Sequence, residues 1–260
     1  MKLNLNDKRV LIAGASQGMG RATALAMANE GAQVFALARN NQALEELAHH
    51  INTQTPGQCH TLCQDITDLP LLTSNLKNLL ATAPLDVYVH SVSGPKPNNA
   101  INTDVERLEQ AQLAHLYASI TITRLILDGM KAKRFGRIIH ILSSSLTQPF
   151  PELTESTIIR HSVNAWSKNL STEVAQFGIT CNTILPGKIA TQRLESVISH
   201  QAQQKGISPE QHLDSLIQSI PARRLGQPEE AADLICFLSS ERAGYVNGMS
   251  ISIDGGLSPR

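Results

Sequence analysis

Apolar runs alternate with alanine-rich or amphipathic stretches along the whole 260-residue chain. The runs at Arg9–Gly14 and Arg137–Ser143 are apolar at nearly every position, as in strands that helices cover on both faces. This repeated strand–helix order predicts a Rossmann-like, doubly wound α/β fold, a parallel sheet with helices on both faces. We expect about seven strands, at Arg9–Gly14, Gln33–Arg39, Cys59–Asp65, Asp86–Val92, Arg137–Ser143, Ile179–Leu185 and Met249–Asp254.

Helical stretches lie between these strands, and no repeat, low-complexity tract or linker divides the chain. We therefore expect a single domain over residues 1–260. The segment from Lys188 to Ala222 is polar and rich in glutamine, and we interpret it as a helical flap, at about residues 188–222, that closes over a substrate. The predicted helices are Gly18–Glu30, Gln42–Ile51, Leu69–Leu80, Val105–Lys131, Glu155–Phe177, Thr191–Ser199, Pro209–Ile220 and Glu229–Leu238.

The charge balance argues against two classes of partner. The 22 lysines and arginines equal the 22 acidic residues, whereas nucleic-acid and anionic-membrane proteins carry a basic excess. Aromatic residues make up only 3% of the chain, too few for the stacking platforms of single-strand binders. No apolar run approaches the ~20 residues of a membrane helix, and the first residues do not resemble a secretory signal. We expect a cytoplasmic protein.

The four cysteines predict neither a disulfide nor a metal site. Cys59, Cys63, Cys181 and Cys236 form no C-x-x-C pair, and we interpret them as buried free thiols in a reduced cytosol. His60 lies between the first two, but in a strand it would point to the opposite face from both. We expect no metal.

A glycine-rich loop follows the first predicted strand, where doubly wound sheets bind their ligands. Glycines at 14, 18 and 20 allow a tight turn that brings backbone N–H groups against a pyrophosphate at a helix N-terminus. The alternative is a plain glycine turn. The candidate phosphate-binding residues are Gly14, Ser16, Gln17, Gly18, Met19 and Gly20.

The second strand ends at Ala38-Arg39, where an NAD site usually carries a carboxylate for the ribose 2′-hydroxyl. That carboxylate is missing, and the guanidinium of Arg39 suits a phosphate dianion. The sequence therefore favours NADP(H) over NAD(H). The alternative is a solvated arginine at the start of the next helix.

The spacing G-x-x-x-G-x-G resembles the nucleotide loop of short-chain dehydrogenases/reductases, and further motifs extend the resemblance over the whole chain. The segments Arg224–Ala232 and Ile253–Gly256 are similar to signatures of the oxoacyl-carrier-protein reductase branch. The family's Asn-Asn-Ala-Gly after the fourth strand is replaced by a segment containing Ser91 and Ser93. The resemblance implies coenzyme contacts from Asp65 and Ile66 at the adenine, from Pro186, Gly187, Ile189 and Thr191 at nicotinamide and pyrophosphate, and from Ser91 and Ser93.

The catalytic part departs from the family pattern of Asn, Ser, Tyr and Lys. The matching positions are His115, Ser143, Ser156 and Arg160, so only the serine at 143 keeps its residue type. This combination looks like a divergent subgroup of the family. The alternatives are a packing role for His115, a hydroxyl in a serine turn for Ser143, and a helix-surface pair for Ser156 and Arg160.

These substitutions change the expected chemistry. The hydroxyl of Ser156 is shorter and a weaker acid than a tyrosine, so it could donate a hydrogen bond more readily than a proton. Arg160 lies on the same helix face and cannot relay a proton, but it could hold the ribose, polarise a carbonyl or bind a carboxylate or phosphate. His115 is the replaced position whose side chain could titrate near neutrality.

The resemblance implies an NADP(H)-dependent oxidoreductase that reduces a carbonyl substrate, of 3-oxoacyl type or smaller, free or carrier-bound, with an altered proton donor. Two alternatives remain open: a catalytically silent nucleotide-binding scaffold or partner protein, and a non-redox enzyme on the same fold. The resemblance also implies a homotetramer or homodimer that assembles through Val105–Lys131 and Glu155–Phe177.

Overall fold

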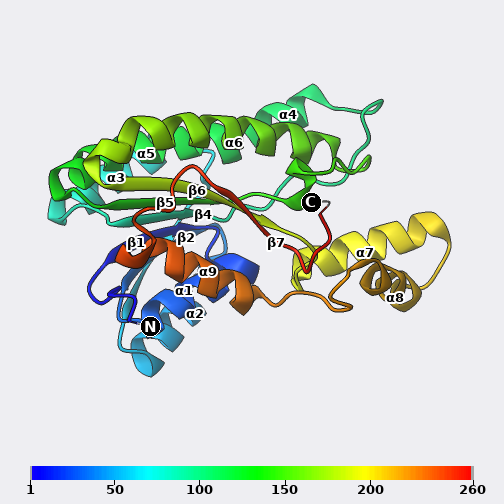
Figure 1. Ribbon diagram of the computed structural model, residues 1–260, viewed down its shortest axis with the longest axis horizontal. Coiled ribbons are helices and arrows are strands. Elements are labelled where there is room, and N and C mark those ends of the chain that lie inside the picture. The colour runs from blue at the N-terminus through cyan, green and yellow to red at the C-terminus, as the bar shows by residue number, and fades with distance from the viewer. Residues whose placement is uncertain (1, 259–260) are drawn as a thin grey trace.

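The computed structural model describes residues 2–258, in which seven strands form one parallel sheet in the order β3-β2-β1-β4-β5-β6-β7 (Figure 1). Parallel neighbours pair in register, for example Ala13 with Leu37 on one side and with His90 on the other. The predicted fold class is confirmed. The strands are β1 Arg9–Ala13, β2 Gln33–Ala38, β3 Gln58–Cys63, β4 Val87–His90, β5 Gly136–Ile141, β6 Ile179–Pro186 and β7 Ser250–Ile253.

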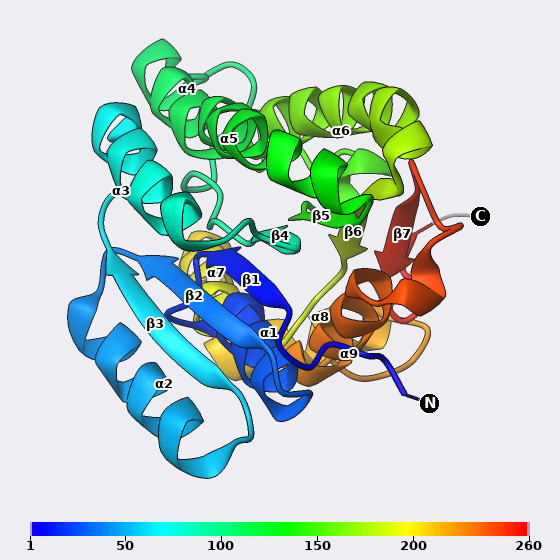
Figure 2. The ribbon, with the colours of Figure 1, turned by 90° about the vertical axis from the view of Figure 1, so that its left-hand side faces the viewer.

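Helices cover both faces of the sheet, as the apolar central strands require (Figure 2). One face packs under α3 (Leu69–Thr82), α5 (Ala118–Lys133) and α6 (Thr154–Val174). The other packs against α1 (Gly18–Asn29), α2 (Asn41–Gln54) and α9 (Pro228–Ser239). Each face has its own buried apolar core; Met27, Leu44 and Leu47 belong to the second, and Leu72, Tyr88 and Ile126 to the first.

The long helix predicted at Val105–Lys131 differs from the observed one. α4 (Val105–Gln112) leads into a wide π-helical turn at Leu113–Tyr117, from which α5 continues. Wide turns of this kind interrupt the regular hydrogen-bond ladder and recur at functional sites. Here the turn contains His115. Other element bounds differ from the predictions by a few residues, with the largest change at the end of the first flap helix.

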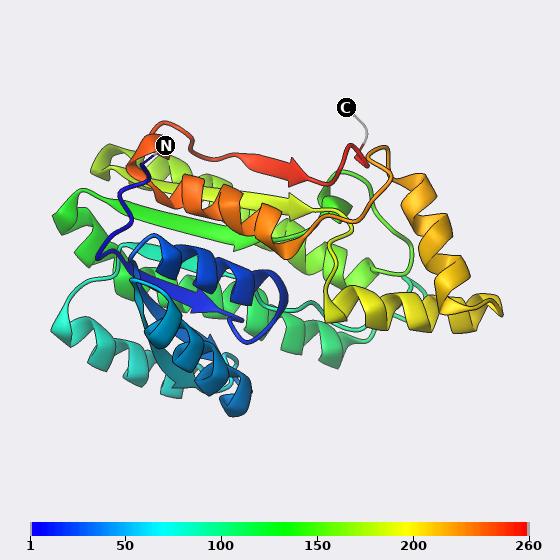
Figure 3. The same ribbon diagram turned by 90° about the horizontal axis from the view of Figure 1, so that it is seen from below.

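The segment predicted as a flap folds into two helices beyond the carboxyl ends of the strands (Figure 3). α7 (Gln192–Lys205) runs six residues past the predicted Ser199, and α8 is Pro209–Ser219. Their apolar side chains pack on each other through Leu194, Ile198 and Leu216. The closure of this flap over a substrate stays a prediction.

Three of the four cysteines are buried as predicted, but the prediction is wrong for Cys63, which is exposed. Cys63 is the last residue of β3, at the carboxyl end of the edge strand, whereas Cys59 on the same strand is buried. His60 lies on the opposite face of β3 from Cys59 and stacks on Phe35 with ring centroids 5.2 Å apart.

Two searches of the described part of the chain gave no result. No helix within residues 2–258 is long and apolar enough to cross a membrane. The same residues contain no group of three histidine, cysteine or acidic side chains placed as metal ligands would be.

Candidate functional site

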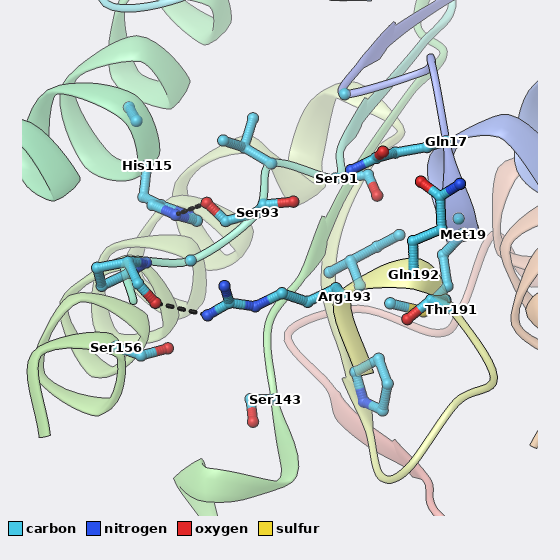
Figure 4. Close-up of a pocket in the computed structure, with 18 of the residues that line it drawn as sticks. Gln17, Met19, Ser91, Ser93, His115, Ser143, Ser156, Thr191, Gln192 and Arg193 are labelled. Carbon is cyan, nitrogen blue, oxygen red and sulfur yellow. Dashed lines mark hydrogen bonds between the residues drawn. The ribbon is translucent and has the colours of Figure 1, made fainter. Parts of the chain in front are cut away.

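A cleft of about 1590 Å³ opens at the carboxyl ends of the strands (Figure 4). Parallel strands bring the loops after β1, β2, β4, β5 and β6 to this edge, which is why residues distant in sequence meet here. All the predicted catalytic and coenzyme-binding residues line the cleft except Gly20, which packs behind the loop. The lining residues are Gly14, Ser16, Gln17, Gly18, Met19, Arg39, Asp65, Ile66, Ser91, Ser93, His115, Ser143, Ser156, Arg160, Pro186, Gly187, Ile189 and Thr191.

The glycine loop forms a cradle that larger residues would fill. Gly14 has a φ of +83°, and a Cβ there would fall 2.8 Å from the carbonyl carbon of Ser91. At Gly20 a Cβ would lie 2.9 Å from the carbonyl carbon of Gly14. α1 starts at Gly18 without a side-chain cap from Gln17 and without an acidic residue in its first turn. Its N–H groups and positive end therefore face the cleft, which fits a pyrophosphate.

Arg39 and Asp65 face each other at the other end of the cradle. The guanidinium Nη1 lies 3.6 Å from Asp65 Oδ2, and both side chains are exposed to solvent. Partial burial would raise the pKa of Asp65, but hydrogen bonds from the Thr67 amide and hydroxyl and the charge of Arg39 lower it overall. A loose, solvated pair leaves the guanidinium able to bind a further anion. These residues fit a phosphorylated adenosine.

Ser143 lies where β5 ends. Its Oγ accepts a hydrogen bond from the Ser145 amide at 3.1 Å and caps a short 3₁₀ turn. The hydroxyl hydrogen is not used by this bond, and the side chain lines the cleft. Ser143 is thus both a hydroxyl in a serine turn and a group that could contact a ligand.

Ser156 is buried and Arg160 is half-buried, and the two form a hydrogen-bonded pair on α6 that lines the cleft, so their placement on the helix surface is wrong. Arg160 Nε donates to Ser156 Oγ at 3.1 Å, and Nη1 donates to the Ile141 carbonyl at 3.2 Å and to that of Leu142. Gly94 packs against the pair; a Cβ there would fall 3.0 Å from Ser156 Oγ. Burial and the charge of Arg193 lower the pKa of Arg160 to about 10, so it is still charged at neutral pH.

His115 is buried, with 1% of its surface exposed, and its Nε2 donates to the Ser93 carbonyl at 3.2 Å. Burial and the nearby charge of Arg160 lower its pKa to about 3. The expectation that His115 titrates near neutrality is therefore wrong, because tertiary packing removes the ring from water. Its observed contact holds the loop after β4.

His115 belongs to a buried cluster of three histidines, completed by His90 and His140. The His90 ring lies 5.7 Å from that of His115 and 6.0 Å from that of His140, measured between centroids. The Tyr88 hydroxyl bonds His90 Nδ1 at 2.7 Å, whereas neither nitrogen of His140 has a hydrogen-bond partner within residues 2–258. Burial lowers the pKa of all three histidines, to about 3 for His140. The cluster is neutral at physiological pH.

Glu155, which no sequence motif marked as functional, connects two elements of the site. Its carboxylate is 1% exposed and accepts hydrogen bonds from Asn98 Nδ2 at 3.0 Å and from the Asp104 amide at 3.1 Å. Arg107 Nη2 lies 3.1 Å from the second oxygen as an ion pair. Glu155 thus ties the loop after β4 to the start of α6, next to Ser156. An acidic residue in the first turn of a helix is so common that it carries no signal.

Arg193 was also missed. It occupies the second position of α7, and its side chain reaches across the cleft toward the loop after β4 (Figure 4). Its Nη2 donates to the Pro95 carbonyl at 2.6 Å. An arginine in a polar, glutamine-rich segment is usually solvated, so only the fold reveals this position.

The fold agrees with a comparison to known proteins. The family described as Enoyl-(Acyl carrier protein) reductase matches residues 14–258. The chain therefore belongs to this branch of the short-chain dehydrogenases/reductases, and it is an oxidoreductase of that family.

Individual relatives span nearly its whole length. The NADPH-dependent reductase BacG of Bacillus subtilis is 28% identical over 97% of this chain and 98% of its own. The 3-oxoacyl-[acyl-carrier-protein] reductase FabG of Haemophilus influenzae is 28% identical over 97% of this chain and 99% of its own. The solved structure of L-sorbose reductase from Gluconobacter frateurii, with NADPH and L-sorbose, has a TM-score of 0.93 at 26% identity, covering 99% of this chain and 98% of its own.

Proposed function

We propose that the protein is an NADPH-dependent reductase of carbonyl compounds in which Ser156 replaces the tyrosine of the family as the hydrogen-bond donor to the substrate oxygen. One observation carries this proposal. Ser156 Oγ accepts a bond from Arg160 Nε at 3.1 Å, so its own hydrogen is left for another acceptor in the cleft. The NADPH dependence of BacG and of L-sorbose reductase supports the coenzyme, and the 3-oxoacyl substrates of FabG support the reaction class.

A bound nicotinamide coenzyme would supply the hydride. The residues of this chain supply position and charge. Ser143 and Ser156 donate hydrogen bonds to the carbonyl oxygen, and the Arg160 cation stabilises negative charge that grows on that oxygen. The oxygen then takes a proton through Ser156, which regains one from solvent. Neutral His115 holds the Ser93 carbonyl and transfers no proton, because its pKa is about 3.

We expect Ser156→Ala to lower kcat for carbonyl reduction by about 100-fold or more, the usual effect of removing a positioned proton donor. The affinity for NADPH should stay unchanged, because the glycine loop and Arg39 are intact. Oxidation of NADPH followed at steady state with a panel of aldehydes, ketones and 3-oxoacyl thioesters measures the effect. Ser162→Ala, a serine on the same helix whose hydroxyl bonds the Ile159 carbonyl, is the matched control. Equal kcat for Ser156→Ala and wild type would reject Ser156 as the donor.

The second candidate is the silent scaffold, and the replacement of the family's tyrosine and lysine by Ser156 and Arg160 favours it. Tight coenzyme binding without turnover of any carbonyl compound would support this candidate over the reductase.

For the coenzyme, we propose that Arg39 selects NADPH by binding the 2′-phosphate in place of Asp65. Arg39→Ser should weaken NADPH binding by about 10-fold or more, the value of one charge-assisted hydrogen bond, and leave NADH binding nearly unchanged. Fluorescence titration of each coenzyme measures both affinities without requiring turnover. Arg242→Ser, at an exposed arginine outside the cleft, is the control. A parallel loss for both coenzymes would show that Arg39 does not discriminate between them.

We also propose that the chain assembles as a homodimer or homotetramer through α4, α5 and α6. The exposed side chains of Tyr117 and Ile158 lie on this layer and support an interface there.

A further inference from the structure

Two guanidinium groups without a counter-ion lie in the cleft. Arg160 projects from α6 and Arg193 from α7, and Arg193 ends on the same side of the cleft as Ser156 (Figure 4). Within residues 2–258, neither forms an ion pair with a carboxylate. In contrast, the third arginine of this region, Arg107, is paired with buried Glu155.

The charge of Arg193 affects the protonation of Arg160. Partial burial lowers the pKa of both arginines, and the charge of Arg193 lowers that of Arg160 further. Lys188 adds a third cation to the cleft, with Nζ 4.9 Å from the centre of the Phe150 ring and with the charge of Glu152 acting on it. Two acidic residues of the cleft near this end, Asp104 and Glu106, are exposed at the start of α4. Like charges that are partly buried together are unfavourable without compensation, so this arrangement favours an anionic ligand.

Both guanidinium groups keep donors available for that ligand. Arg193 donates through Nη2 to Pro95, and its Nε and Nη1 have no hydrogen bond to residues 2–258. Arg160 uses Nε and Nη1, while Nη2 faces Gly94, where a Cβ would fall 3.1 Å away. Nη2 has no hydrogen bond to residues 2–258, and the missing side chain at position 94 leaves this donor uncovered. Guanidinium groups bind carboxylates through such free N–H pairs.

The phosphates of the coenzyme do not account for these donors. The pyrophosphate fits the glycine loop, and the 2′-phosphate fits Arg39, whereas the tip of Arg193 points to the opposite side of the cleft from Gln17 and Met19 (Figure 4). The anion must come from the other ligand of the cleft, the substrate.

We infer that the substrate is a short oxo acid whose carboxylate binds between Arg193 and Arg160, an inference that rests on the proposed reductase function. The point that a Cβ of residue 94 would occupy lies 3.0 Å from Ser156 Oγ and 3.1 Å from Arg160 Nη2, so the group that binds the carbonyl oxygen and the free donor for the carboxylate are adjacent. This spacing selects 2-oxo and 3-oxo acids over longer ones. Because Arg193 belongs to the first turn of α7, the carboxylate also holds the flap against the cleft.

The test compares acids with uncharged analogues on the complete protein. Wild type should reduce 2-oxobutanoate or 3-oxobutanoate with kcat/KM at least about 10-fold above that of the methyl ester. Arg193→Met should lower kcat/KM about 50-fold for the acid and change it little for the ester. Arg193→Lys keeps the charge, and its kcat/KM for the acid should lie between those of wild type and Arg193→Met. Lys205→Met removes one exposed cation from the same helix and is the control. The thermal midpoint of each variant reports its folding.

A binding arm separates this inference from the reductase proposal. Titration calorimetry of 3-hydroxybutanoate with the NADP⁺ complex needs no hydride transfer. Binding that Arg193→Met abolishes supports the carboxylate site even if no carbonyl is reduced. Equal reduction of acid and ester, with equal effects of Arg193→Met on both, overturns the site while the reductase stands. If the protein neither binds the hydroxy acid nor reduces any carbonyl compound, both proposals are overturned.

A last arm distinguishes two sources of anion. The 3-oxobutanoyl thioesters of pantetheine and of 4′-phosphopantetheine differ only in the phosphate of a carrier arm. If Arg193→Met lowers kcat/KM for the phosphorylated thioester alone and leaves that for the free acids unchanged, Arg193 binds a carrier phosphate. This result would overturn the carboxylate inference.

Discussion

Lowering the pH from 7 to 5 is expected to reduce the free energy of unfolding by about 4 kcal/mol through His115 and His140, and the burial of His90 adds to this loss. His90, His115 and His140 are at most 1% exposed, and burial lowers the pKa of each far below the ordinary 6.5, to about 3 for His115 and His140. At pH values between 6.5 and about 3, these histidines bind protons in the unfolded chain but not in the folded chain. Stability is therefore full above pH 6.5 and falls as the pH drops toward 3.

Urea unfolding at pH 7, 6 and 5 measures this loss. Domains commonly have 5–15 kcal/mol of stability, so we expect unfolding without denaturant to begin near pH 5. His140→Leu, at the histidine whose two ring nitrogens have no partner in the described chain, should make the loss between pH 7 and pH 5 smaller by about 2 kcal/mol. His161→Gln, on the exposed face of α6, should leave it unchanged. The same pH dependence in His140→Leu and wild type would contradict a neutral buried His140.

Replacing Arg160 with methionine is expected to lower the free energy of unfolding by about 3 kcal/mol and kcat by about 1000-fold. The variant leaves the carbonyls of Ile141 and Leu142 without their donor and Ser156 Oγ without its partner. Both carbonyls lie at the end of β5, so the strand end and the hydroxyl that faces the cleft lose their position together. Chemical unfolding and single-turnover oxidation of NADPH measure the two effects.

Arg160→Lys separates the charge from the hydrogen bonds. An ammonium group keeps the cation but cannot reach all three acceptors in the planar arrangement of a guanidinium. We expect Arg160→Lys to be more stable than Arg160→Met but less stable than wild type. Its kcat should be at most about a tenth of the wild-type value, which corresponds to the loss of one charge-assisted hydrogen bond. Arg124→Met on α5, an exposed arginine, controls for the loss of a cation. Wild-type turnover in Arg160→Met would remove Arg160 from the proposed chemistry.

The fold was predictable because its determinants are local. The alternation of apolar strands with helices implies a parallel sheet, and the glycine loop marks its ligand-binding edge. The positions that match the family's catalytic pattern, Ser143, Ser156, Arg160 and His115, all line one cleft. These positions depend on the spacing between elements, which a sequence records directly.

The electrostatics of the site could not be predicted in the same way. Arg193 contacts a carbonyl 98 positions away in the chain, and Glu155 contacts Asp104 at a separation of 51. The pKa of His115 depends on burial by elements that are distant in sequence. The π-helical turn that holds His115 follows the same apolar periodicity as the regular helix on either side, so no pattern marked it.

The sheet order also has a consequence for how the chain folds. β1 is synthesised before one of its two neighbours, β4, whose Val87 pairs with Val10. One edge of β1 therefore stays open until β4 has left the ribosome. Closing a contact between residues so distant in sequence costs chain entropy and is slow. We therefore expect the pairing of β1 with β4 to limit the rate at which this protein folds.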